Sequence, residues 1–220
     1  GSFGEYQWIS YQDSMKQIDM IGSGIAQLTG GHKGDFGAIF SINTPEWLLT
    51  QHALWRQGMC VVPLYSTFGL EALSYILSET ELRLAVVNAD LLPDICQAAE
   101  TVIKNNGREA LKLQYVVRMS RPLGMGEPLG PFPEAITERA RAIGLNLVTW
   151  EELLSIGTQH PCPPCLPTPE DLHSLMYTSG TMGKPKGVML THRAFTLTAD
   201  KSWVHTVFPD DKSNEVHMSY

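Results

Sequence analysis

The sequence predicts an α/β fold of the doubly wound type, in which a parallel sheet is covered by helices on both faces. Two observations predict it. Short runs that are apolar at almost every position alternate with longer segments whose apolar residues recur every three or four residues. Strands that are apolar on both sides need cover on both faces, and helical crossovers between parallel strands provide it. The alternation therefore predicts one sheet between two layers of helices.

The first half of the chain follows this alternation closely. Ser10 and Asp13 have the spacing of a capping box, and the helix that they begin ends at Gly30 and Gly31. Thr44 and Pro45 have the order of an N-cap followed by a first helical residue. The strands expected here are 36–42, 60–64 and 84–88, and the further helices are 45–57, 70–79 and 91–105.

The second half is interrupted twice. A strand at 115–119 precedes a Gly- and Pro-rich loop at 120–133, and a second proline-rich stretch lies within 158–170. We interpret 1–170 as an α/β subdomain with its linker at 158–170, and 171–220 as the start of a second subdomain. The other elements expected are helices at 136–143, 151–156 and after Thr191-His192, and strands at 146–149, 173–177, 188–190 and 215–220.

Composition narrows the class of protein. Hydrophobic residues make up 43% of the chain and charged residues 18%, which is typical of a globular fold. The net charge of -7, without a basic block, argues against nucleic acid as a partner. No apolar run reaches the roughly 20 residues that span a bilayer, and no signal peptide is recognisable. The first residues are Gly1 and Ser2 rather than Met, so the question whether a segment with a membrane anchor precedes them stays open.

The four cysteines divide into two kinds. Cys60 and Cys96 lie in apolar patterns and are expected to be buried. Cys162 and Cys165 form one pair that contains two prolines, and structural zinc sites usually need four ligands. Although His160 lies nearby, we expect a linker and no metal.

Residues 178–187 form the candidate anion-binding loop of the sequence. They read Thr-Ser-Gly-Thr-Met-Gly-Lys-Pro-Lys-Gly, between two short apolar strands. Glycines let backbone N–H groups turn towards a ligand, hydroxyls can bind phosphate or Mg²⁺, and two lysines add charge. A plain polar turn is the alternative, but it needs neither three hydroxyls nor two lysines. The spacing is not that of a Walker loop, because only two residues separate Gly180 from Gly183 and Pro185 follows Lys184.

The stretch 177–187 resembles the phosphate-binding signature of the acyl-adenylate-forming enzymes. Three further stretches, 6–11, 43–47 and 62–69, are similar to long-chain fatty acyl-CoA synthetases. The resemblance implies a fatty acid–CoA ligase that joins a carboxylate to ATP and then passes the acyl group to CoA. It implies Lys186 as the catalytic residue and Thr178 as a Mg²⁺ contact. The nucleotide-binding residues that it implies are Thr178, Ser179, Gly180, Thr181, Met182, Gly183, Lys184 and Lys186.

Two departures from the family pattern qualify this resemblance. Met182 stands where the family usually has Thr or Ser, so one phosphate contact is expected to be lost or replaced. The resemblance also implies that the chain is an N-terminal fragment, without the C-terminal domain and inactive alone. Another carboxylate-adenylating enzyme, or a non-catalytic nucleotide-binding module, stays open. The family implies ATP, fatty acid and CoA as small-molecule substrates. It also implies an intracellular parent protein, and attachment of that protein to the endoplasmic reticulum, mitochondrial or peroxisomal membrane stays open.

Overall fold

A computed structural model describes residues 8–120, 129–178 and 184–200 of the 220-residue chain. The strands are β1 (Phe36–Phe40), β2 (Cys60–Leu64), β3 (Leu84–Val87), β4 (Tyr115–Arg118), β5 (Asn146–Thr149), β6 (Leu172–Thr178) and β7 (Lys186–Thr191). The α-helices are α1 (Tyr11–Thr29), α2 (Pro45–Arg56), α3 (Leu70–Glu79), α4 (Leu92–Asn106), α5 (Glu134–Ala142), α6 (Trp150–Gln159) and α7 (His192–Asp200). Two short 3₁₀ turns are η1 (Ala89–Leu91) and η2 (Arg108–Ala110).

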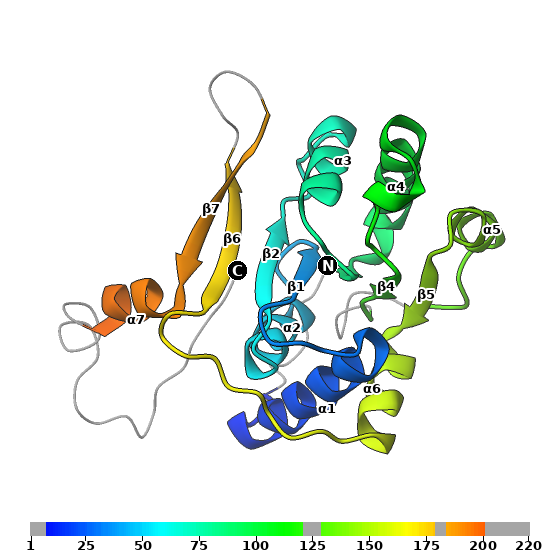
Figure 1. The fold of residues 1–220 in the computed structure, drawn as a ribbon. Helices are drawn as coiled ribbons and strands as arrows, with labels where there is room; N and C mark the ends of the chain where they lie inside the picture. Colours follow the sequence, from blue (N-terminus) through cyan, green and yellow to red (C-terminus); the bar gives the residue numbers. More distant parts are fainter. Residues whose placement is uncertain (1–7, 121–128, 179–183, 201–220) are drawn as a thin grey trace, which may run out of the picture.

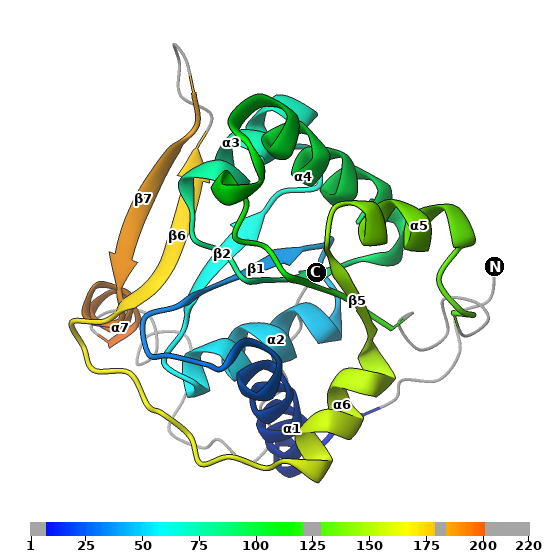
Figure 2. The ribbon, with the colours of Figure 1, turned by 45° about the vertical axis from the view of Figure 1, so that its right-hand side comes forward.

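The strands form one sheet in the order β5-β4-β3-β1-β2-β6-β7. All neighbouring pairs are parallel except β6 and β7, which form an antiparallel hairpin at the edge of the sheet. Helices α3, α4 and α5 cover one face, and α1, α2 and α6 cover the other (Figures 1 and 2). The predicted fold class is therefore confirmed.

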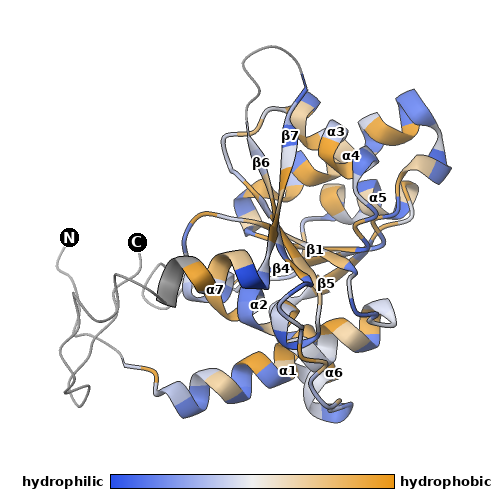
Figure 3. Cartoon of the chain, turned by 60° about the vertical axis from the view of Figure 1, so that its left-hand side comes forward, coloured by the Kyte–Doolittle hydropathy of each residue, from blue (hydrophilic) through white to orange (hydrophobic). Residues whose placement is uncertain are grey.

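The core follows from this layering. Each face of the sheet carries its own cluster of buried apolar side chains, one under α3 and α4 and one under α1, α2 and α6. The strands at the centre of the sheet are mostly hydrophobic, whereas each helix carries both hydrophobic and hydrophilic residues (Figure 3). Because β2 and β3 are buried at every position, their sequences show no alternation.

Local signals determine most helix ends. The Ser10 hydroxyl accepts from the Asp13 N–H, and α1 ends with Gly30 in the left-handed conformation at φ 74°. The predicted capping box at Ser10 is only half formed. The Asp13 carboxylate accepts a hydrogen bond from the Ser10 hydroxyl, whereas in a full capping box it would accept from the Ser10 backbone N–H. A full capping box lies at Thr149 and Glu152, where it begins α6.

The helices α1 and α6 approach closely enough to need glycine. A Cβ atom on Gly157 would lie 1.8 Å from the carbonyl oxygen of Met20, and one on Gly24 would lie 2.5 Å from that of Leu153. Because backbone atoms cannot move aside as a flexible side chain can, neither position has room for a side chain. The helix α6 extends to Gln159, beyond the predicted 151–156, and Gly157 in its last turn lies against Met20 of α1.

The proline-rich linker is tied to the α1 and α2 layer. The Cys162 N–H donates to the Ser23 hydroxyl (3.1 Å), and the Cys165 N–H donates to the carbonyl of Arg56 (2.9 Å). Lys33 forms an ion pair with Asp171 at 2.7 Å. The linker therefore leads the chain to β6, which joins the same sheet through β2. The subdomain boundary near residue 170 stays a prediction, and the strand expected at 215–220 lies outside the described residues.

Candidate phosphate-binding hairpin

The two strands that flank the candidate loop are β6 and β7. Thr178 is the last residue of β6 and Lys186 the first of β7, and they are cross-strand partners in the antiparallel ladder. β6 runs parallel to β2, so the loop follows the carboxyl end of a parallel strand, where open α/β sheets commonly bind ligands. Ser179, Gly180, Thr181, Met182 and Gly183 lie outside the described residues. The structure thus brings Thr178 and Lys186 together at the base of the loop.

The two lysines of the loop have different surroundings. The ammonium group of Lys184 lies 5.0 Å from the centre of the Tyr75 ring, a cation–π contact with α3. Lys186 is exposed, and within the described ranges no carboxylate lies at ion-pair distance from it. Thr178 is also exposed. Lys186 and the Thr178 hydroxyl are therefore available to an anion, whereas Lys184 already has an aromatic partner.

A carboxylate on α3 connects this helix to the hairpin. Glu79 accepts a hydrogen bond from the Tyr177 hydroxyl at 2.6 Å and another from the Tyr75 hydroxyl at 2.7 Å. Tyr177 is almost fully buried, and burial, followed by the bond to Glu79, raises the pKa of its phenol. The bond to Glu79 also raises the pKa of Tyr75. Both phenols therefore stay protonated and act as donors.

Gly187 is the last residue of the signature, and packing explains it. It is the cross-strand partner of Tyr177. A Cβ atom at this position would lie 2.9 Å from Cδ1 of Leu175 and 3.2 Å from Cζ of Tyr177. The glycine therefore lets β7 lie close against the side chains of β6.

The other end of the hairpin is fixed by aromatic packing. The ring of His173, in β6, lies between Trp55 of α2 and Phe195 of α7, with 4.1 Å between ring centres in each case. The Trp55 indole N–H donates to the carbonyl of His173 at 2.8 Å. His192 also contacts the His173 ring, at 5.0 Å between ring centres. This group is called the aromatic anchor: Trp55, His173, His192 and Phe195.

Two ring nitrogens of the aromatic anchor have no partner. Nε2 of His173 and Nε2 of His192 are both buried without a hydrogen bond to any residue that the structure describes. Burial, with smaller contributions from His192 and His52, lowers the pKa of His173 from 6.5 to about 4. Burial also lowers the pKa of His192. Neutral histidines therefore suit this packing. The cap of α7 is Thr191 rather than His192, because the Thr191 hydroxyl accepts from the Ala194 N–H.

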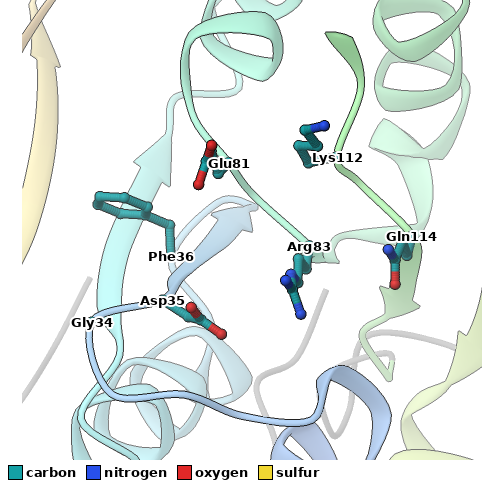
Figure 4. Close-up of a pocket in the computed structure, with 7 residues that line it drawn as sticks. All are labelled: Gly34, Asp35, Phe36, Glu81, Arg83, Lys112 and Gln114. Carbon is teal, nitrogen blue, oxygen red and sulfur yellow. The ribbon is translucent and has the colours of Figure 1, made fainter. Parts of the chain in front are cut away.

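A separate hollow lies at the amino ends of the strands. It has a volume of about 300 Å³ and lies between the segments that lead into β1, β3 and β4 (Figure 4). The charged residues among those that line it are Asp35, Glu81, Arg83 and Lys112. None of the residues of the candidate loop that the structure describes lines it. It is therefore separate from the candidate site.

Other expectations concern metals, cysteines and membranes. Cys60 and Cys96 are buried, as predicted. No group of three or more potential metal ligands occurs in the ranges that the structure covers, and the absence of metal at Cys162 and Cys165 stays a prediction. Among the helices described, none is both long and apolar enough to cross a bilayer.

Sequence reasoning missed the contribution of α3. Tyr75 and Glu79 are one helical turn apart, which is readable as a pair on one face. Nothing in the sequence connects them with Tyr177, which lies 98 residues beyond Glu79. The missing information is which helix packs beside the hairpin, and only the fold supplies it.

Comparisons with known proteins give a consistent result. A family model described as AMP-binding enzyme matches residues 2–220. Fatty acyl-CoA synthetase A of Dictyostelium discoideum is 33% identical over all of this chain and 30% of its own length. Long-chain-fatty-acid–CoA ligase 6 of Mus musculus is 35% identical over 85% of this chain and 25% of its own length. Peroxisomal long chain acyl-CoA synthetase 7 of Arabidopsis thaliana is 32% identical over all of this chain and 28% of its own length.

Solved structures share the fold. The adenylation domain of a carboxylate reductase from Mycobacterium chelonae has a TM-score of 0.71 and 20% identity, over 90% of this chain and 30% of that one. The anthranilate CoA ligase AuaEII, solved with anthranoyl-AMP, has a TM-score of 0.63 and 21% identity, over 88% of this chain and 32% of that one. The chain thus spans between a quarter and a third of the length of these proteins. Because one family model matches almost every residue, this chain belongs to the family of AMP-binding enzymes.

Proposed function

We propose that the protein carrying this chain is an ATP-dependent acid–thiol ligase that activates long-chain fatty acids. In the proposed reaction the acid carboxylate attacks the α-phosphate of ATP, which gives acyl-AMP and releases pyrophosphate. The thiol of CoA then attacks the acyl carbon, which gives acyl-CoA and releases AMP. The names of the curated relatives, at 32–35% identity, support the substrate class. The family supports the use of a nucleotide.

One observation carries the proposal to this chain. Thr178 and Lys186 are paired at the base of a loop rich in glycine and hydroxyl groups, and Lys186 has no described carboxylate partner. Pyrophosphate gains negative charge as it leaves, and a fixed cation stabilises that charge more than it stabilises bound ATP. Lys186 is therefore proposed as the cation that speeds adenylation.

The rest of the loop is proposed to hold the β- and γ-phosphates. Backbone N–H groups at Gly180 and Gly183 and the hydroxyls of the loop would donate to phosphate oxygens. The exposed Thr178 hydroxyl suits Mg²⁺, because this ion prefers oxygen ligands and keeps most of its coordination for water and phosphate. The eight proposed nucleotide contacts are Thr178, Ser179, Gly180, Thr181, Met182, Gly183, Lys184 and Lys186.

The cellular context is proposed on the relatives alone. One relative is named as peroxisomal, so an intracellular location is proposed, with association to the membrane of an organelle. The partners proposed are the small-molecule substrates ATP, fatty acid and CoA. The negative net charge still argues against nucleic acid.

The test is acid-dependent exchange of labelled pyrophosphate into ATP by the full-length protein. Acids of short, medium and long chain are compared at equal concentration, with an acid-free reaction as the control. We expect exchange with long-chain acids, and acyl-CoA formation once CoA is added. Exchange without any thioester would instead indicate another carboxylate-adenylating enzyme, and no exchange with any acid would indicate a non-catalytic nucleotide-binding module.

A further inference from the structure

We propose that Glu79 is a positioning residue for the phosphate-binding loop, because its carboxylate fastens the end of β6, and through Tyr75 the loop residue Lys184, to α3. This inference rests on the proposed function. It concerns a residue of α3 that lies about a hundred positions before the loop in the sequence.

The first strand is reached directly. Tyr177 immediately precedes the loop residue Thr178, and its hydroxyl donates to one carboxylate oxygen of Glu79 at 2.6 Å. Tyr177 is 2% exposed, so its hydroxyl has little access to water. A buried donor without an acceptor is costly, and Glu79 is the acceptor that lets a tyrosine lie here. Hydrogen bonds to a carboxylate are also stronger than neutral ones.

The residues that leave the loop are reached through an aromatic ring. The other carboxylate oxygen of Glu79 accepts from the Tyr75 hydroxyl at 2.7 Å, which fixes the orientation of that ring. Lys184, on the far side of the loop, places its ammonium group 5.0 Å from the centre of the same ring. Tyr177 also packs directly beneath Gly187 of β7. Glu79 therefore restrains the residues that enter the loop and the residues that leave it.

Glu79 is not suited to bind a phosphate itself. It is negatively charged, and each of its oxygens already accepts a tyrosine hydroxyl. Its effect on a nucleotide is therefore indirect, through the position of Thr178 and Lys186. Catalysis and phosphate binding are sensitive to displacements of about 1 Å, so loosening the base of the loop is expected to weaken both.

The experiment compares three variants of the full-length protein. Glu79→Ala removes both acceptors, Tyr177→Phe removes one donor and keeps the ring, and the double variant removes both partners. Glu100→Ala is the matched control. Glu100 of α4 also accepts two hydrogen bonds, both from Arg139 of α5, and neither residue belongs to the hairpin or to α3.

Two readouts separate positioning from general stability. The first is the Kd of ATP with Mg²⁺ by calorimetry, and the second is the KM for ATP against the KM for the fatty acid in pyrophosphate exchange. We expect Glu79→Ala to raise the Kd and KM of ATP about 10-fold, with the KM of the acid changed less than about 2-fold. Tyr177→Phe should raise both constants for ATP in the same direction, and the double variant should add little to Glu79→Ala, because both remove one interaction. Glu100→Ala should lower the melting temperature without changing the constants for ATP.

The proposal is overturned if Glu79→Ala lowers the melting temperature as Glu100→Ala does and leaves the Kd of ATP unchanged. It is also overturned if the two single variants add independently in the double variant. Binding and exchange can disagree, and that keeps the two hypotheses distinguishable. Wild-type protein that binds ATP but supports no acid-dependent exchange contradicts the proposed function, while the calorimetric comparison still tests Glu79.

Discussion

Replacing His173 tests whether the aromatic anchor is built for neutral rings. The side chain of His173 is 4% exposed, its Nε2 has no partner in the described residues, and its pKa is lowered from 6.5 to about 4. The unfolded chain therefore binds a proton near pH 6.5, whereas the native protein resists it until about pH 4. Stability falls as the pH is lowered through this window and levels off below it.

The size of the effect follows from the same pKa values. One pKa unit corresponds to about 1.4 kcal/mol, so the full difference sets a ceiling of about 3 kcal/mol for His173. His192 has a lowered pKa as well and contributes with the same sign. His173→Phe keeps a ring between Trp55 and Phe195 but cannot take up a proton. We expect this variant to lose a large part of the acid sensitivity, whatever its stability at neutral pH.

The assay is denaturant unfolding of the full-length protein, followed by tryptophan fluorescence, to which Trp55 contributes. It is repeated between about pH 7.5 and about pH 4.5, a range that covers most of the interval between the two pKa values of His173. The control is His160→Asn, which removes an exposed histidine outside the aromatic anchor. Parallel curves of stability against pH for wild type and His173→Phe would refute the reasoning, because they would mean that His173 does not control the response.

Two further predictions concern packing and thiol chemistry. Gly187→Ala should cost about 1–3 kcal/mol, because its Cβ would press on Leu175 and on the Tyr177 ring. Gly130→Ala, with no neighbour within 4 Å, should cost less, and the melting temperatures of the two variants test this. Burial raises the pKa of the Cys60 thiol to about 12, so Cys60 should react with a maleimide only after unfolding, whereas the exposed Cys165 should react in the native protein. Mass spectrometry of labelled peptides checks this, and rapid native labelling of Cys60 would contradict it.

The sheet and its helices were predictable because their signals are local. The strands β1, β2 and β3 carry no polar side chain, and Thr44 with Pro45, Gly30 and Gly107 define helix ends within a few residues. The length of α6 was less predictable, since its last turn depends on packing against α1. The capping box at Thr149 and Glu152 was a readable signal for its first turn.

The candidate site was predictable only in part. The loop from Thr178 to Lys186 is contiguous, so its residue types alone indicate an anion site. Its supports come from α2, α3 and α7, and the sequence does not specify which helices pack on a given strand. The difference between Lys184 and Lys186 is also a tertiary property, because it depends on the ring of Tyr75. The site residues themselves stay predictions until they are tested.

Lys186 provides the most direct test of the whole account. The measurement is the rate of long-chain acid-dependent pyrophosphate exchange in the full-length protein, for Lys186→Ala beside Lys184→Ala. Lys186 is proposed to stabilise the charge on leaving pyrophosphate, so its loss should slow exchange roughly 100-fold or more. Lys184 rests against Tyr75, so Lys184→Ala should cause a clearly smaller loss. Unchanged exchange in Lys186→Ala, in protein that melts at the wild-type temperature, would contradict the central claim.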